Sequence, residues 1–467
     1  MMNQYLFREY DIRGNANEEL TDDFVKKIGM ALGTYFRRKN AKILSVGRDC
    51  RLHSDRLHKA LLEGLFSTGI DVVDIGVVAT PLLYFSVFHF HFDGGIQITG
   101  SHNPKTDNGF KILDGERPFF GTQLQMLRTM IETNDFDLAE KRGTLSTLSV
   151  VNDYLGFVKT KLQMGARRFK IVVDAGNGTG GVFLVPLLKE AGFEVVDLFC
   201  EMDGSFPNHH PDPTVEKNLL HLQNEVKRVG AEIGLALDGD ADRLGAVDQQ
   251  GRIVFGDQLL LLLAKAILLE EPGAIFLGEV KCSQAVYDEI EKAGGTAVMW
   301  KVGHSLLKEK MKEIGAALAG EMSGHLFFAH RYLGYDDAIY AGARLVELLS
   351  NSKHPFSTHI DMLPKLHNTP EIRKDVSEED KFEIVRQVIL RFQKEPTAKV
   401  VQIDGARIQC QDGWALVRAS NTQSALVMRF EANTKERLLE IQTWVETEVF
   451  AIEQELKSKN VGQRTPM

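Results

Sequence analysis

A serine in a short polar segment is the first residue whose setting suggests chemistry. Residues 99–104 read Thr-Gly-Ser-His-Asn-Pro, so Ser101 follows a glycine and precedes His102. Lys111 supplies a positive charge further along. A serine in such a turn is more often only a turn former, but an exposed nucleophile is placed in the same way. Asn103 replaces the second glycine of the G-x-S-x-G elbow, so acyl transfer is not supported.

Three aspartates at alternate positions form the second group. Asp238, Asp240 and Asp242 follow a short apolar run, and their carboxylates can converge on one hard cation. Mg²⁺ prefers such oxygen ligands and keeps positions open for phosphate, and Arg243 can clamp a phosphoryl group. An EF-hand loop needs glycine and glutamate where this chain has Arg243 and Gln249, so calcium is excluded. A solvated acidic turn is the alternative, which the preceding apolar run disfavours.

Two further loops carry groups that suit a sugar and a phosphate. Glu321 and Ser323 lie between two glycines and can exchange hydrogen bonds with vicinal hydroxyl groups of a sugar. Residues 418–422 read Arg-Ala-Ser-Asn-Thr, which combines a guanidinium, hydroxyls, an amide and loop N–H groups into a possible phosphate cradle. Each loop considered alone is more typical of an ordinary polar turn.

The elements that must position these groups alternate along the chain. Short β-branched runs, such as residues 43–46 and 171–173, are separated by helical stretches such as residues 57–65 and 285–292. This alternation predicts α/β layers with parallel or mixed sheets. Polar and glycine-rich turns follow several strands, the first at residues 47–49, and open α/β sheets bind ligands at such strand ends.

Composition limits the classes of partner. The chain has 467 residues, 43% hydrophobic and 25% charged, and at roughly 100–200 residues per domain three or four domains are expected. A net charge of −9 without a long basic stripe argues against nucleic-acid binding. The four scattered cysteines form no zinc motif or disulfide framework. The longest apolar run, residues 259–269, is too short for a membrane span and predicts a buried helix, so we expect a cytoplasmic protein without membrane contact.

Changes in composition predict where the domains end. The last domain opens with a charged helical stretch over residues 377–394, continues with short strands and turns, and ends in a polar tail from residue 457 that we expect to fray. A hairpin turn is expected at residues 250–251. The predicted domains are residues 1–147, 148–250, 251–365 and 366–467.

Taken together and in this order, these segments resemble the α-D-phosphohexomutases, in particular the bacterial phosphomannomutase/phosphoglucomutase group. The resemblance covers nearly the whole chain. The matching segments are residues 7–14 (opening motif), 99–104 (phosphoserine loop), 238–243 (magnesium loop), 320–325 (sugar-binding loop) and 418–422 (phosphate-binding loop).

The resemblance implies a fold and a reaction. The fold has four domains around a central active-site cleft, three related α/β domains and a smaller C-terminal α+β domain. The reaction reversibly transfers phosphate between hexose 1-phosphate and hexose 6-phosphate, of mannose or glucose, through phosphorylated Ser101 and a hexose 1,6-bisphosphate that is also the activator. One Mg²⁺ would be held by Asp238, Asp240, Asp242 and Ser101. The partners would be small phosphosugars, and we expect a monomer.

The resemblance also implies roles for the other candidates. The catalytic candidates are Ser101, His102, Lys111, Arg13 and Arg243. Proton transfer could fall to Arg13, His102, Lys111 or His325, and the sequence does not choose among them. The expected substrate-binding residues are Tyr10, Lys281, His304, Glu321, Ser323, His325, Arg418, Ser420, Asn421 and Thr422.

Three other interpretations stay open. A phosphoglucosamine mutase would use the same chemistry, although Met322 between Glu321 and Ser323 resembles the mannose/glucose group. A metal-assisted phosphatase would need water at the phosphoserine, which a mutase must exclude. A sugar-phosphate sensor without catalytic activity would not need Ser101 or the three aspartates. This chain has both, which argues against a sensor.

Overall fold

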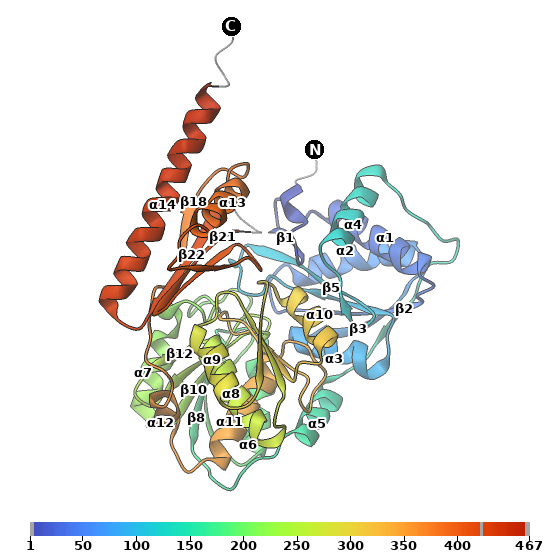
Figure 1. Cartoon of the computed structure of the whole chain (residues 1–467). Coiled ribbons are helices and arrows are strands. Elements are labelled where there is room, and N and C mark those ends of the chain that lie inside the picture. The colour runs from blue at the N-terminus through green and yellow to red at the C-terminus, as the bar shows by residue number, and fades with distance from the viewer. Residues whose placement is uncertain (1–3, 421–423, 463–467) are drawn as a thin grey trace.

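Four sheets follow one another along the chain, each with its own helices (Figure 1). The computed structural model describes residues 4–420 and 424–462. The first three sheets combine parallel strands with an antiparallel edge, and the fourth is antiparallel throughout. The predicted fold class, three α/β units and a smaller α+β unit, is confirmed. Within the described residues, no helix combines the length and apolar content needed to cross a bilayer.

The first sheet has the order β1-β5-β4-β2-β3-β7, with β6 beside β5. Helices α1, α2 and α4 cover one face, and α3 covers the other. The Ser101 loop connects β4 to β5, which run antiparallel. The strands are β1 (Ile12–Asn15), β2 (Ile43–Arg48), β3 (Asp71–Val77), β4 (Gly94–Ile98), β5 (Asp107–Asp114), β6 (Arg117–Pro118) and β7 (Leu145–Thr147), and the helices are η1 (Gln4–Leu6), α1 (Asp22–Arg38), α2 (Ser54–Ser67), α3 (Thr80–Phe90) and α4 (Thr122–Thr133).

The second sheet has the order β12-β11-β10-β8-β9. Strand β10 is buried along its whole length and ends at Leu237, so the aspartate loop is the connection of the antiparallel β10–β11 hairpin. The hairpin turn predicted at residues 250–251 is also present, but it places β12 in this sheet, beyond the domain limit predicted at residue 250. The elements are α5 (Val151–Lys161), β8 (Lys170–Asp174), α6 (Gly181–Glu190), β9 (Glu194–Leu198), η2 (Glu216–Leu219), α7 (Leu220–Val229), β10 (Ile233–Leu237), β11 (Leu244–Asp248) and β12 (Ile253–Val254).

The third sheet has the order β14-β13-β15-β16. The leucine-rich run at residues 259–269 lies in α8, which packs into a core shared with the second sheet and with α11. The sugar-binding loop predicted at residues 320–325 links the antiparallel strands β15 and β16. The elements are α8 (Gly256–Glu270), β13 (Ile275–Glu279), α9 (Gln284–Lys292), β14 (Thr296–Trp300), α10 (His304–Ile314), β15 (Leu318–Gly320), β16 (Leu326–Phe328), α11 (Ala338–Asn351) and α12 (Phe356–Asp361).

The fourth sheet has the order β17-β22-β21-β20-β19, with β18 beside β22, and packs against α13 and α14. The charged helix predicted over residues 377–394 is shorter in the structure, where α13 begins at Lys381 and ends at Phe392. Within the tail predicted to fray from residue 457, residues 457–462 continue α14, a helix already nucleated on the sheet, and residues 463–467 lie outside the described residues. The elements are β17 (His367–Asn368), β18 (Ile372–Asp375), α13 (Lys381–Phe392), β19 (Lys399–Val401), β20 (Ala406–Cys410), β21 (Gly413–Ala419), β22 (Ala425–Ala432) and α14 (Lys435–Gly462).

Candidate active site

The Ser101 side chain meets the aspartate loop across the boundary between the first and second sheets. Its Oγ donates a 2.8 Å hydrogen bond to Asp238 Oδ2 and lies 3.1 Å from His102 Nδ1. Ser101 is buried and has a φ of +46°, a left-handed conformation that is uncommon for a residue with a side chain. Strained backbone of this kind gathers at functional sites. The loop therefore holds the hydroxyl of Ser101 against a carboxylate.

The three aspartates converge as the sequence predicts. Asp238, Asp240 and Asp242 are fully buried, and ligand atoms of all three lie within 4.8 Å of one another. Burial, with the charges of Asp242 and Asp240, raises the pKa of Asp238 well above its usual range. Asp240 Oδ1 and Asp242 Oδ1 are buried without a hydrogen-bond partner among the described residues. Unpaired buried carboxylate oxygens are costly, so the three side chains fit a hard divalent cation.

Lys111, on β5, pairs with two of these aspartates. Its Nζ lies 2.6 Å from Asp240 Oδ2 and also contacts Asp242 Oδ2. Burial acts to lower the pKa of Lys111, but the charges of Asp240 and Asp242 outweigh it and raise that pKa. Thr80 Oγ1 donates a further hydrogen bond of 2.5 Å to Asp240 Oδ2. Lys111 is therefore a buried cation paired with Asp240 and Asp242.

Arg13 and His102 lie on the same side of the site. Arg13 Nε donates to Asp11 Oδ2 at 2.6 Å, and its Nη1 donates to Asn103 Oδ1 at 2.8 Å. Burial acts to lower the pKa of Arg13, but the carboxylates of Asp11, Asp240 and Asp242 together outweigh it and raise that pKa, so the guanidinium stays charged. Burial, and then the charges of Arg243 and Arg13, lower the pKa of His102 well below its usual range. His102 is therefore neutral beside Ser101.

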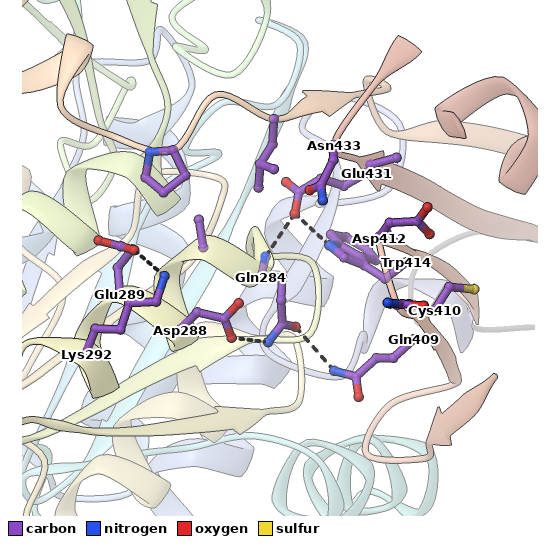
Figure 2. Close-up of a pocket in the computed structure, with 16 residues that line it drawn as sticks. Gln284, Asp288, Glu289, Lys292, Gln409, Cys410, Asp412, Trp414, Glu431 and Asn433 are labelled. Atoms are coloured by element: carbon purple, nitrogen blue, oxygen red, sulfur yellow. Dashed lines mark hydrogen bonds and ion pairs between the residues drawn. The ribbon is translucent and has the colours of Figure 1, made fainter. Parts of the chain in front are cut away.

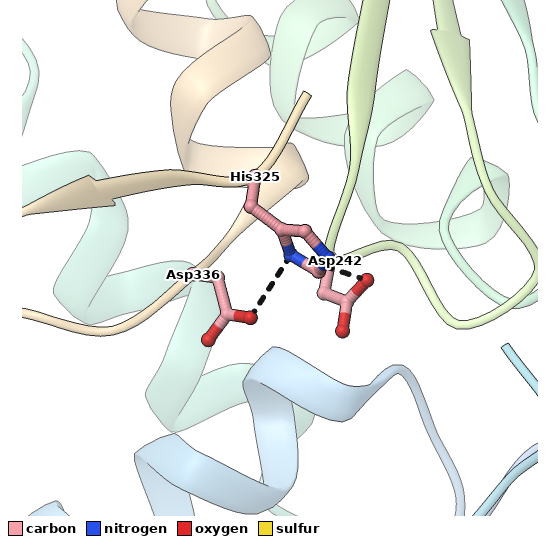
Figure 3. A group of neighbouring side chains, drawn as sticks. All are labelled: Asp242, His325 and Asp336. Atoms are coloured by element: carbon pink, nitrogen blue, oxygen red, sulfur yellow. Dashed lines mark ion pairs between the residues drawn. The ribbon is translucent and has the colours of Figure 1, made fainter. Parts of the chain in front are cut away.

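His325 joins the second and third sheets. Its Nδ1 lies 3.1 Å from Asp336 Oδ2 and 3.7 Å from Asp242 Oδ1, as Figure 3 shows. Its Nε2 accepts a hydrogen bond of 3.0 Å from Arg243 Nε. Distance alone would allow Asp242, His325 and Asp336 to hold a metal ion. Lys308 Nζ lies 2.9 Å from Asp336 Oδ1, so this cluster is paired with a lysine just as Asp240 and Asp242 are paired with Lys111.

His304 and Tyr10 line the approach to His325. The ring of His304 stacks on that of His325, with centroids 5.6 Å apart, and the ring of Tyr10 meets His304 edge-on at 5.8 Å. Tyr10 also donates a hydrogen bond of 2.7 Å to the carbonyl of Val302. The opening segment of the chain thus contacts the third sheet directly.

The predicted sugar-binding loop, residues 320–325, is held by hydrogen bonds that involve Glu321, Ser323 and main-chain N–H groups. Glu321 Oε1 accepts from the Gly303 N–H at 2.8 Å, and Ser323 Oγ donates to Glu321 Oε2 at 3.0 Å. Glu279 Oε1 accepts from the Met322 N–H at 3.0 Å and lies 3.6 Å from Lys281 Nζ. Burial raises the pKa of Glu279 to about 7.

The predicted phosphate loop approaches the third sheet through Arg418. Its Nη2 lies 3.1 Å from Asp404 Oδ2, which also accepts a hydrogen bond of 3.1 Å from the Val302 N–H. Lys381 Nζ donates to the Ser420 carbonyl at 2.7 Å. Asn421 and Thr422 lie outside the described residues. Contacts therefore link the four sheets in one series, from Ser101 through the aspartates and His325 to Arg418.

A cavity of about 460 Å³ separates α9 from the fourth sheet and lies outside the predicted site (Figure 2). On its wall, Glu431 Oε1 accepts from the Gln284 N–H at 3.0 Å and from Trp414 Nε1 at 2.7 Å. Beside it, Arg407 donates to the carbonyl of Cys282 at 3.0 Å, and Arg429 donates to that of Lys281. These residues join the fourth sheet to the segment that carries Lys281.

Several residues of the site were not predicted from the sequence. Thr80, Lys308 and Asp336 complete the surroundings of the aspartates and His325, and no nearby motif marks them. Glu279 ends β13, and its only signal in the sequence is that it stands two residues before Lys281. Glu371, 3.3 Å from Lys281 Nζ, and Asp404 come from the fourth sheet and its connections.

Comparisons with known proteins agree with this arrangement. Four family models match in order, all described as phosphoglucomutase/phosphomannomutase: alpha/beta/alpha domain I over residues 4–137, domain II over 152–251, domain III over 255–366 and the C-terminal domain over 371–447. The phosphomannomutase/phosphoglucomutase of Pseudomonas aeruginosa PAO1 is 43% identical over 455 residues, which cover 97% of this chain and 96% of that protein. The phosphoglucomutase of Neisseria gonorrhoeae is 42% identical over 442 residues, 94% of this chain and 95% of that protein.

Solved structures give the same result. The crystal structure of a phosphoglucomutase/phosphomannomutase family protein from Burkholderia thailandensis matches with a TM-score of 0.91 and 39% identity, covering 97% of this chain and 98% of that one. The N-acetylphosphoglucosamine mutase of Aspergillus fumigatus, at 13% identity and a TM-score of 0.63, shares the fold alone. The chain belongs to the phosphoglucomutase/phosphomannomutase family.

Proposed function

We propose that this protein is a mutase that reversibly converts hexose 1-phosphate to hexose 6-phosphate, with mannose and glucose as the sugars. The observation that carries the proposal is the 2.8 Å hydrogen bond from Ser101 Oγ to Asp238, which places the hydroxyl at the edge of a buried group of three carboxylates. The names of the relatives from Pseudomonas and Neisseria support the same sugars.

Ser101 is the phosphate carrier in this proposal. Its Oγ–P bond breaks as a bond forms between phosphorus and the free hydroxyl of the sugar, which gives a hexose 1,6-bisphosphate. After the bisphosphate has turned end for end, Ser101 takes back the other phosphate. Asp238, Asp240 and Asp242 would hold Mg²⁺, which when bound neutralises charge on the phosphoryl group.

The proton of the attacking hydroxyl needs an acceptor. Lys111 and Arg13 are charged and cannot serve, which leaves His102 and His325. Asp336 faces Nδ1 of His325, and Nε2 accepts the hydrogen bond from Arg243 Nε. We assign proton acceptance to His325 Nε2, which requires Arg243 to leave Nε2 for the phosphoryl group. To neutral His102, 3.1 Å from Ser101 Oγ, we assign the support of that oxygen.

The remaining candidates would bind the substrate. Glu321 and Ser323 would bind ring hydroxyls, which look alike in the two orientations of the sugar. Tyr10, Lys281 and His304 would line the sugar. The phosphate that does not react would be bound by Arg418, Ser420, Asn421 and Thr422, with Arg243 near the phosphate that does.

Phosphorus NMR with mannose 1-phosphate, glucose 1-phosphate and glucosamine 1-phosphate tests this function. In the presence of Mg²⁺ and catalytic bisphosphate, the first two should give 6-phosphates without inorganic phosphate. Faster conversion of the glucosamine ester would favour a phosphoglucosamine mutase. Release of inorganic phosphate without isomerisation would favour a phosphatase, and binding without any conversion a sensor.

We also propose that the enzyme is a cytoplasmic monomer. The contacts from Ser101 to Arg418 all lie within one chain, so a complete site needs no second copy. All four cysteines are free, which suits a reducing compartment. Light scattering after size exclusion and fractionation of the source cells test the two statements.

A further inference from the structure

One buried arginine, Arg51, binds the main-chain carbonyls of the loop that carries Ser101. Arg51 Nη2 donates to the carbonyls of Ser101 and Asn103, both at 2.7 Å. Its Nη1 donates to the carbonyls of Pro104 at 2.7 Å and Asp107 at 3.0 Å. The side chain is completely buried. One guanidinium therefore fixes the carbonyl groups of the loop on both sides of its turn.

Asp49 fixes the N–H side of the same loop. Its Oδ2 lies 3.2 Å from Arg51 Nε and accepts hydrogen bonds from Thr99 Oγ1 at 2.8 Å and the Gly100 N–H at 3.2 Å. Thr99 Oγ1 in turn accepts from the Ser101 N–H at 2.8 Å. Asp49 and Arg51 follow directly after β2, so the end of one strand builds the loop at the end of its neighbour β4.

Residues packed around Arg51 restrict the position of its guanidinium. A Cβ atom at Gly100 would lie 2.7 Å from its Cζ and Nε, so only glycine admits the guanidinium there. On the side of the second sheet, the Phe206 ring covers the guanidinium, with its centroid 5.1 Å from Cζ. Gly204 forms a β-bridge with Arg51 in the same segment.

We propose that Arg51 is a positioning residue for phosphoryl transfer, which holds Ser101 in its left-handed conformation and directs Oγ to Asp238. This proposal rests on the proposed function. A guanidinium presents five N–H donors in a rigid planar fork. Here Nη1 and Nη2 donate to four carbonyls of the loop, and Nε lies beside the carboxylate of Asp49. A lysine ammonium carries three donors at one point and cannot reproduce this pattern. Arg51 contacts the Ser101 loop and none of the proposed sugar-binding side chains. Its loss should therefore lower kcat and leave KM unchanged.

The test is Arg51→Lys, compared with Arg56→Lys. Arg56 lies on the adjoining helix and also donates to main-chain carbonyls, those of Ala16 and Leu20, but away from the Ser101 loop. Misplacement of a reacting group by about 1 Å can cost about 10²-fold in rate, so R51K should lower kcat by about that factor. KM should stay within about threefold, and R56K should keep the kcat of the wild type. Titration of the unphosphorylated enzyme with Mn²⁺ should give the same affinity for R51K, because the aspartates are untouched.

Amide hydrogen exchange supplies a readout that does not depend on activity. In R51K, exchange over residues 99–107 should accelerate, while exchange over residues 238–243 stays as in the wild type. Unchanged exchange over residues 99–107, or wild-type kcat in R51K, would overturn the positioning role. A wild-type enzyme that converts no hexose phosphate would overturn the proposed function, and hydrogen exchange would still decide the role of Arg51.

A second variant covers the case in which R51K does not fold. Gly100→Ala keeps Arg51 but forces its guanidinium away, so it should show the same fall in kcat and the same faster exchange over residues 99–107. Wild-type kcat and exchange in G100A would contradict the proposal on their own.

Discussion

Ser101 Oγ donates a 2.8 Å hydrogen bond to Asp238 Oδ2, although 137 residues separate the two in the chain. The bond joins the ends of two strands in different sheets, β4 and β10. Asp238 is one of the three buried aspartates whose ligand atoms lie within 4.8 Å of one another. The candidate phosphate carrier and the candidate cation site are therefore one site.

Asp240→Asn should remove metal-dependent activity. The substitution takes one anionic ligand from the cation and leaves a neutral amide beside Lys111. We expect kcat to fall by about 10²–10³-fold, as when other groups that stabilise transition-state charge are lost. Activity measured against Mg²⁺ concentration, with metal affinity from calorimetry, checks this. Asp23→Asn, an exposed aspartate on α1, is the control and should match the wild type. Unchanged magnesium dependence in D240N would contradict the metal site.

Gly239→Ala should separate the aspartate loop from the Ser101 loop. A Cβ atom at Gly239 would lie 2.5 Å from the Ser101 carbonyl oxygen, and both loops would have to move. Because the reacting groups are misplaced, kcat should fall by about 10–10²-fold. Gly156→Ala on α5 is the matched control, since a Cβ there meets nothing within 4 Å, and it should raise the free energy of unfolding by about 0.5–1 kcal/mol. Equal kcat in both variants would mean that the contact of the loops is unimportant.

Stability should depend on pH through His209. Burial acts to lower the pKa of His209, but hydrogen bonds of 3.0 Å to both oxygens of Asp174, with that carboxylate's charge and a bond to the His210 carbonyl, outweigh it and raise the pKa. Because His209 binds its proton more tightly in the folded state, protonation stabilises the fold. This stabilisation is complete at pH values below the pKa of His209 in the unfolded chain, about 6.5, and it is lost as pH rises through the pKa in the folded protein. His209→Gln should lower Tm by about 2–4 °C in acid and by less at higher pH.

Thermal unfolding of the wild type and H209Q from about pH 5.5 to about pH 8.5 measures the difference. Asp174→Asn removes the partner and should flatten the same pH dependence. A Tm difference between wild type and H209Q that stays constant over this range would show that His209 is not protonated in the folded protein.

Much of this site was predictable because its strongest signals are local. The Ser101 segment and the three aspartates each occupy a few consecutive residues at a strand end, and the structure places both there. The apolar run at residues 259–269 was sufficient to predict a buried helix, which the structure places in α8. The ends of elements were less predictable: the stretch expected over residues 57–65 became α2 (Ser54–Ser67).

The residues that contact Ser101, His325 and Arg418 could not be predicted from the sequence, because the packing of the sheets decides which side chains meet. Arg51 lies two residues after the strand-end turn at residues 47–49, yet only the neighbouring strand β4 brings it under Ser101. Asp336 reaches His325 from the segment before α11, and Asp404 reaches Arg418 from the loop before β20. A polar residue in a loop gives no sign of which buried charge it will meet.

Ser101→Ala gives the most direct test of whether Ser101 carries the phosphate. The variant and Ser67→Ala, a control on α2 away from the site, are incubated with hexose 1-phosphate, catalytic hexose 1,6-bisphosphate and Mg²⁺, and followed by phosphorus NMR and intact mass. We expect S67A to behave as the wild type, whereas S101A should keep its fold, acquire no phosphate and lose nearly all turnover. Near-normal turnover in S101A, or a phosphorylated S101A protein that is still active, would contradict this expectation.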